Sequence, residues 1–78
     1  MTYIQNKRGD LTIKGLDQGH MQTRFSGKCK LTLWRELGTF HVRGVYYCGE
    51  HKGERAFWQT FDKLSEARRR FYEPARQK

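Results

Sequence analysis

The sequence predicts an α+β fold in which an antiparallel three-stranded meander precedes a carboxy-terminal helix. Three observations lead to this fold class. Apolar and polar residues alternate over 28–37, aromatic and β-branched residues recur over 40–48 and 54–61, and apolar residues recur at helical spacing over 62–73. With 78 residues, the chain has room for a single small domain.

The first strand, predicted over 28–37, ends at a turn. Its apolar side chains share one parity and its polar side chains the other, and only Trp34 on the polar side and Arg35 on the apolar side depart from the pattern. Residues 38–39, glycine and threonine, follow as a two-residue loop with glycine first, the arrangement of a type II′ hairpin turn. A second antiparallel strand is therefore predicted over 40–48.

A loop at residues 38–39 also predicts which residues face one another across the two strands. It places Trp34 opposite Arg43 on one face of the sheet and Cys29 opposite Cys48 on the other. With this register the apolar parities of the two strands match, so one face of the hairpin is apolar and the other carries cations and rings.

The third strand, predicted over 54–61, follows a glycine-bounded turn and is rich in aromatic residues. Its facing depends on the length of that turn, because one additional loop residue reverses every side chain. The preferred interpretation is a loop over 50–53. The core face then takes Phe57 and Phe61, and the outer side takes Ala56, Trp58 and Thr60.

The carboxy-terminal helix is predicted over 62–73, with Asp62 as its N-cap and Pro74 ending it. Its apolar residues recur at helical spacing and form one stripe that packs on the sheet. They are Leu64, Ala67 and Phe71. The consecutive arginines at 68–70 either complement the helix dipole or contact phosphate beside the sheet.

The first 27 residues are harder to assign. Short strands are possible at 3–4 and 11–13, and the segment 15–27 has the composition of a loop. The sequence leaves open whether this part of the chain covers the outer sheet face.

Charge is the strongest functional signal in the sequence. Sixteen Lys and Arg against eight Asp and Glu give a formal net charge of +8, which attracts polyanions through its long-range field. A basic surface that serves only solubility is the alternative. The position of the charges on the fold decides between these interpretations.

The sequence predicts a cytoplasmic protein without membrane association. It has no run of about 18 apolar residues, and residues 1–8 lack the apolar stretch of a secretory signal. Two cysteines, Cys29 and Cys48, are too few for a disulfide framework and agree with a reducing compartment. These features leave the oligomeric state undetermined.

Neither a metal site nor an active site is predicted. Cys29, Cys48, His20 and His51 could be collected around zinc, but the chain has no CxxC pair, and both cysteines fit better as buried thiols. The acids and histidines form no HExxH, P-loop or GxSxG motif. We therefore expect a binding module with no cofactor and no catalytic residues.

The outer face of the predicted sheet combines cations with large rings. Lysine and arginine neutralise phosphates, while rings and guanidinium groups contact bases or sugars, so this combination predicts nucleic-acid binding. In the alternative interpretation, Trp34, Val45 and Trp58 form a second small core beneath the amino-terminal segment. The predicted nucleic-acid contacts are Lys28, Lys30, Trp34, Arg43, Tyr47, Lys52, Arg55 and Trp58.

An aromatic-x-Val-Arg strand, a basic glycine turn, a strand ending in Phe and a helix opening with Glu-Ala follow one another over 38–72. They are Phe40-His41-Val42-Arg43, Lys52-Gly53, Phe61 and Glu66-Ala67. In this order they resemble the sheet-plus-helix DNA-binding domain at the amino terminus of phage and transposon tyrosine integrases. The resemblance implies a sheet laid in the DNA major groove, with Arg43 and its sheet-face neighbours as contacts. Lys63 departs from the threonine or serine usual in that family.

The leading prediction is therefore binding of double-stranded DNA through the outer sheet face, as a regulator of a phage or mobile element. RNA is a second possible ligand, because basic and aromatic residues on a sheet also stack single-stranded bases. A rival prediction from another class is a small phage-type protein that inhibits a host protein machine, with exposed aromatic residues as its binding hot spot.

Overall fold

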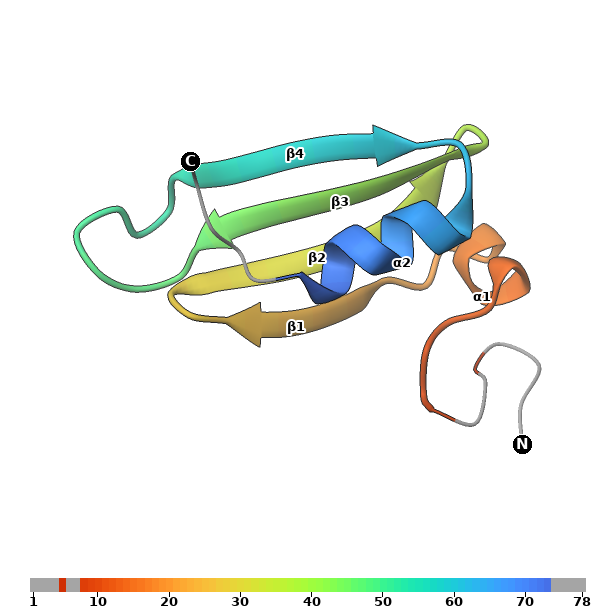
Figure 1. Ribbon diagram of the computed structural model, residues 1–78, viewed down its shortest axis with the longest axis horizontal. Coiled ribbons are helices and arrows are strands. Elements are labelled where there is room, and N and C mark those ends of the chain that lie inside the picture. Colours follow the sequence, from red (N-terminus) through yellow and green to blue (C-terminus); the bar gives the residue numbers. More distant parts are fainter. Residues whose placement is uncertain (1–4, 6–7, 74–78) are drawn as a thin grey trace.

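The computed structural model describes residue 5 and residues 8–73, and it combines a four-stranded antiparallel sheet with two helices. In chain order the elements are α1 (Ile13–Asp17), β1 (Gln22–Ser26), β2 (Cys29–Glu36), β3 (Thr39–Tyr46), β4 (Arg55–Phe61) and α2 (Leu64–Tyr72). The strands lie in the sheet in the order of the sequence, so β1 and β4 are the two edges. Figure 1 shows α2 crossing one face of the sheet and α1 at one end.

The α+β class, the antiparallel sheet and the carboxy-terminal helix are confirmed, but the sheet has four strands where the sequence predicts three. The predicted loop over 15–27 is wrong, because it contains most of α1 and all of β1. Strand β1 joins β2 through a two-residue turn in which Gly27 has a φ of 60°. A strand this short and polar carries little apolar signal, which is why composition alone indicates a loop.

The hairpin between β2 and β3 turns at residues 37–38, one position earlier than predicted. Both turn residues have positive φ, 54° at Leu37 and 80° at Gly38, which is the pattern of a type I′ turn whose twist matches that of the strands. The register therefore moves by two residues, and Trp34 faces His41. A shift of two leaves every side chain on its predicted face.

Both predicted cross-strand pairs change as a result. Arg43 faces Thr32 where the sequence predicts Trp34, and Cys29 faces Tyr46 where it predicts Cys48. The predicted pairs were wrong because glycine at the first turn position is only one of several ways to close a two-residue hairpin.

Replacing Leu37 with asparagine is expected to raise the free energy of unfolding by about 1 kcal/mol. Leucine pays about 1–2 kcal/mol for left-handed backbone, whereas asparagine is favoured at this position of a type I′ turn. The leucine side chain is 98% exposed, so the substitution removes no packing. Urea unfolding measures the change, and Leu37→Val, whose branched Cβ is poorly suited to left-handed backbone, should give no gain.

The predicted facing of the third strand is confirmed at four positions and wrong at one. Phe57 and Phe61 pair with core-face residues of β3, while Trp58 and Thr60 lie on the opposite side. Ala56 is the exception. The register shifts between Gly44 and Val45, so Ala56 is an additional residue in a bulge and packs half-buried against the core.

The core lies between the sheet and the two helices. Its fully buried members come from β2, β3, α1 and α2, and the apolar stripe of α2 packs as predicted through Ala67 and Phe71. The largest of them are Phe71, Leu16, Leu31, Leu33, Val42 and Cys29. One hydrophobic layer therefore joins the helices to one face of the sheet, which is called the core face below.

The helix α2 begins later than predicted. Its N-cap is Lys63, whose side chain makes no capping hydrogen bond, so Asp62 does not cap the helix. The expected end at Pro74 lies outside the described residues. Of the possible amino-terminal strands, residues 3–4 also lie outside them. In the segment 11–13, Leu11 forms a single bridge with Gln5 and Ile13 already begins α1.

A polar cluster ties the residues before α1 to β1 and to the end of α2. The carboxylate of Asp10 is buried and accepts hydrogen bonds from the Tyr72 hydroxyl and from Gln22 Nε2, the latter at 2.9 Å. Arg24 of the same strand donates to the Phe71 carbonyl oxygen at 2.6 Å. These contacts explain why a polar edge strand is retained against the helix.

Replacing Tyr72 with phenylalanine is expected to lower the free energy of unfolding by about 1 kcal/mol, because the buried Asp10 carboxylate loses a donor. Burial, and then the hydrogen bond and charge of Asp10, raise the pKa of Tyr72. The native state therefore holds this proton more tightly than the unfolded chain, and the stabilisation is lost as pH rises from about 10 through the native pKa. Urea titrations at neutral and alkaline pH measure both effects. The phenylalanine variant should lose less stability at high pH than the parent, and an equal loss would contradict the assignment.

Among residues 8–73, neither helix is long and apolar enough to cross a bilayer.

Candidate functional site

The sheet face opposite the helices, called the outer face below, is left uncovered by the described part of the chain. Both helices pack on the core face, and β1 lies beside β2 in the sheet and not over it. The predicted alternative, a second core beneath the amino-terminal segment, therefore has no support from residues 8–27. The outer face presents Thr23, Phe25, Lys30, Thr32, Trp34, Glu36, Thr39, His41, Arg43, Val45, Arg55, Trp58 and Thr60.

Three rings form a cluster across β2, β3 and β4 on this face. The Trp34 and His41 rings stack with centroids 5.0 Å apart and planes 9° apart. The Trp58 ring lies 5.8 Å from Trp34, and its indole Nε1 donates to His41 Nδ1 at 3.2 Å. Trp34 Nε1 in turn donates to Glu36 at 3.3 Å. The cluster holds Trp34, on a central strand, at 9% exposure, while Trp58 on the edge strand remains 45% exposed.

Guanidinium groups lie against these rings. The Arg43 guanidinium carbon is 5.4 Å from the Trp34 centroid and 5.6 Å from the Trp58 centroid, and that of Arg55 is also 5.6 Å from Trp58. Such contacts hold a cation in a defined position through the ring quadrupole and leave its N–H groups available to an anion. Arg43 Nε is buried and has no hydrogen-bond partner among the described residues.

A second aromatic pair lies at the opposite edge of the sheet. Phe25 of β1 is 59% exposed, and its ring meets Tyr47 edge-on with centroids 4.9 Å apart. The Tyr47 hydroxyl donates to the Gly27 carbonyl oxygen at 3.3 Å, which fixes the ring beside the β1–β2 turn. Lys30 is exposed and is paired directly with Phe25. The outer face therefore has an exposed ring at each edge and cations between them.

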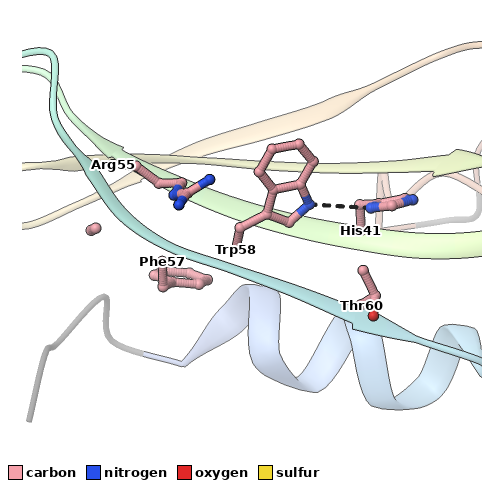
Figure 2. A pocket seen from close by; sticks show the side chains of 6 residues that line it. His41, Arg55, Phe57, Trp58 and Thr60 are labelled. Carbon is pink, nitrogen blue, oxygen red and sulfur yellow. Dashed lines mark hydrogen bonds between the residues drawn. The ribbon is translucent and has the colours of Figure 1, made fainter.

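A hollow of about 610 Å³ follows the outer edge of β4. Its polar lining comes from His41, Arg55 and Thr60, and its apolar lining from Ala56, Phe57 and Trp58. Figure 2 shows Arg55, Trp58 and His41 on one side of β4 and Phe57 on the side that faces α2. Because His41 Nδ1 accepts from Trp58, the neutral imidazole carries its proton on Nε2, which is left as a donor.

Five of the eight predicted contact residues come together on the outer face. Lys30, Arg43, Arg55 and Trp58 present part of their surface there, and Trp34 supports them from below. The other three lie around the sheet. Tyr47 follows the end of β3, Lys28 lies in the β1–β2 turn with its side chain against Gly49, and Lys52 is exposed in the β3–β4 loop.

Sequence reasoning missed Phe25, and it treated His41 and Thr60 as incidental. Phe25 lay in the predicted loop over 15–27, and it is the one apolar residue of 22–26, so no alternation marks this strand. The glycine at 27, which forms part of the β1–β2 turn, was the only local signal of a hairpin there. The contacts of His41 with both tryptophans depend on the corrected register, which places it opposite Trp34.

The arginine run at 68–70 is largely occupied within the protein. Arg68 donates to the Leu11 carbonyl oxygen at 2.7 Å, and Arg70 donates to Gln59 at 2.6 Å with its guanidinium 3.8 Å from the Phe57 ring. Arg69 is exposed on α2. These contacts favour a packing role for Arg68 and Arg70 over the predicted alternative of phosphate contact.

The two cysteines differ in environment. Cys29 is buried, and burial followed by the charge of Cys48 raises the pKa of its thiol. Cys48 is exposed, so the prediction of two buried thiols is wrong for it. It lies beyond the end of β3, where the corrected register leaves it without a partner position in β2. Within residues 8–73, no three histidine, cysteine or acidic side chains gather as a metal site would require.

Comparisons of this chain with protein-family models, with curated proteins and with solved structures find no match. The resemblance to integrase DNA-binding domains therefore stays a prediction from the residues that carry it.

Proposed function

We propose that this protein binds nucleic acid through the outer face of its sheet. The observation that carries the proposal is the pair of cations on this uncovered face, because the guanidinium groups of Arg43 and Arg55 both lie over the Trp58 ring. Among the described residues of this face, Glu36 is the acid, and it lies at the end of the sheet away from Lys30 and Arg55. An incoming phosphate chain therefore meets Lys30 and Arg55 away from that carboxylate.

Two physical effects support this function. A net charge of +8 on 78 residues concentrates polyanions near the surface, and each neutralised phosphate releases condensed counterions. Exposed rings then contribute stacking with bases, which any base can provide. A sheet face that carries both cations and exposed rings therefore supplies electrostatic attraction and base stacking at the same place.

Fluorescence anisotropy with labelled oligonucleotides tests the proposal. Duplex DNA, the ligand that the integrase resemblance implies, and unpaired strands of the same sequence are the probes. We expect binding at low salt with a logarithmic affinity that falls steeply and linearly with the logarithm of salt concentration. The variant Arg69→Ala is the matched control, since it removes one charge from the helix on the other side of the sheet. No binding to any probe at low salt would reject the proposal.

A protein partner is the alternative, and the exposed rings of Trp58 and Phe25 favour it because partly exposed aromatic residues are common anchors of protein interfaces. Affinity capture from nuclease-treated lysate, with Trp58→Ala as the control bait, separates the two functions. A partner lost on that substitution, together with no affinity for nucleic acid, would select the alternative.

A further inference from the structure

The exposed rings of the outer face lie at its two edges, Phe25 on β1 and Trp58 on β4, and the hollow described above opens beside the second of them. From this arrangement we infer that the outer face takes an unpaired nucleic-acid strand, with one base seated in the hollow beside Trp58. The inference rests on the proposed nucleic-acid binding and names the form of the ligand.

The width of the sheet is the first argument. Neighbouring strands are about 4.8 Å apart, so the backbones of β1 and β4 are separated by about 14 Å before side chains are added. The DNA major groove is about 12 Å wide and admits an α-helix or a two-stranded ribbon. The outer face as a whole is too wide to enter it. If the two central strands entered the groove, the ligand would meet Trp34, which is buried. The exposed rings on the two edge strands would then lie outside the groove.

The hollow is the second argument. Its volume of about 610 Å³ falls within the range of sites that hold small organic ligands, and the Trp58 ring forms one wall. A base that stacks on an indole must be unpaired or turned out of its helix, because its neighbours otherwise cover both of its faces. An unpaired strand presents such bases without the cost of opening a duplex.

The polar groups around the hollow match the rest of a nucleotide. The guanidinium carbon of Arg55 lies 5.6 Å from the centroid of the Trp58 ring, so this group can pair with a phosphate next to a base on Trp58. On the other side of the ring, the Nε2–H of His41 and the hydroxyl of Thr60 supply donors that can meet acceptor atoms of a base. Figure 2 shows these three side chains around Trp58 on the same strand pair.

A path leads from the hollow across the sheet. Arg43 is paired with Trp58, and Lys30 is paired with Phe25, so a cation stands next to the exposed ring at each edge. A strand that crosses the outer face would therefore meet a ring, two cations and a second ring in turn. This alternation is the arrangement of single-strand binding surfaces, in which cations track the backbone and rings stack bases.

The test compares labelled oligothymidine and oligouridine of about 12 nucleotides with a DNA duplex of the same length, by anisotropy at one fixed low salt concentration. We expect an unpaired probe to bind at least about 10-fold more tightly than the duplex. We expect Trp58→Ala to weaken the binding of that probe by about 5- to 150-fold, which corresponds to the loss of one base stack. Trp58→Phe keeps a ring and should recover most of the affinity. Urea unfolding of both variants confirms that each is folded.

Intrinsic fluorescence adds a readout that a structural role of Trp58 would not move. Unlabelled oligothymidine should quench tryptophan emission in the parent protein, and Trp58→Phe should bind without that quenching, because the remaining Trp34 is buried. The relative binding of oligothymidine and oligouridine ranks a DNA probe against an RNA probe, which differ in the sugar and in a methyl group on the base. Duplex binding as tight as single-strand binding, unaffected by Trp58→Ala, would overturn this inference and leave the proposed function standing. Failure of every probe would overturn both.

Discussion

Replacing Arg43 with alanine is expected to weaken nucleic-acid binding by about 5- to 150-fold, which corresponds to about 1–3 kcal/mol for one arginine contact. The guanidinium lies over both the Trp34 and the Trp58 ring near the centre of the outer face, where a ligand strand would cover it. Its Nε is buried and lacks a hydrogen-bond partner in the described part of the chain, so hydrogen bonds within these residues do not fix this group. Anisotropy titrations at fixed salt measure the loss.

Three further variants separate the effect of the position of Arg43 from the effect of bulk positive charge. Arg43→Lys keeps the charge without the planar group, so it should recover the long-range attraction but not the full affinity. Lys52→Ala, in the exposed β3–β4 loop, should weaken all sequences alike, whereas Arg43→Ala should also relax any sequence preference. Arg69→Ala should have little effect. Equal losses from Arg43→Ala and Arg69→Ala would show that only bulk charge matters.

Replacing Gly44 with alanine is expected to lower the free energy of unfolding by about 1–3 kcal/mol. Gly44 lies in the middle of β3 on the core face, opposite Phe57, and a Cβ added there would come within 2.5 Å of the Phe57 ring. The ring cannot move freely, since the Arg70 guanidinium lies 3.8 Å from its centroid and is held by Gln59. The clash therefore outweighs the gain of less than about 1 kcal/mol that alanine gives by restricting the unfolded chain.

A double-mutant cycle tests this explanation for Gly44. Phe57→Leu shortens the opposing side chain, so Gly44→Ala should cost much less in its presence than in the parent, with a coupling energy of about 1 kcal/mol or more. Urea midpoints of the four proteins provide the measurement. Additive losses would mean that the cost arises from the backbone of β3 and not from the ring.

The faces of the sheet could be predicted because side-chain direction in a strand alternates residue by residue and is visible in any short window. The prediction that Arg43 and the two tryptophans lie on one face was therefore correct although the predicted register was wrong. The turn itself could not be predicted in this way. Local rules reject leucine at positive φ, and yet Leu37 occupies that position because the twist of the paired strands favours a type I′ turn.

The strand β1, and with it the position of Phe25, could not be predicted from the sequence for a different reason. Residues 22–26 have little apolar surface of their own, and they are held in the sheet by pairing with β2 and by the contacts of Gln22 and Arg24 with Asp10 and the end of α2. The hydrogen-bond partners of Gln22 and Arg24 are 12 and 47 residues away in the chain. Tertiary contacts of this range decide whether such a segment becomes a strand, and no local pattern records them.

The sequence by itself determined the α+β class, the apolar and the cationic faces of the meander, the helix stripe and the basic charge, because each depends on periodicity or composition within a few residues. Only the tertiary structure decided the register, the fourth strand and the difference between the two tryptophans. Trp34 and Trp58 share a face and have similar local surroundings in the sequence. Trp34 is buried because its strand has neighbours on both sides, and Trp58 stays open because its strand is an edge.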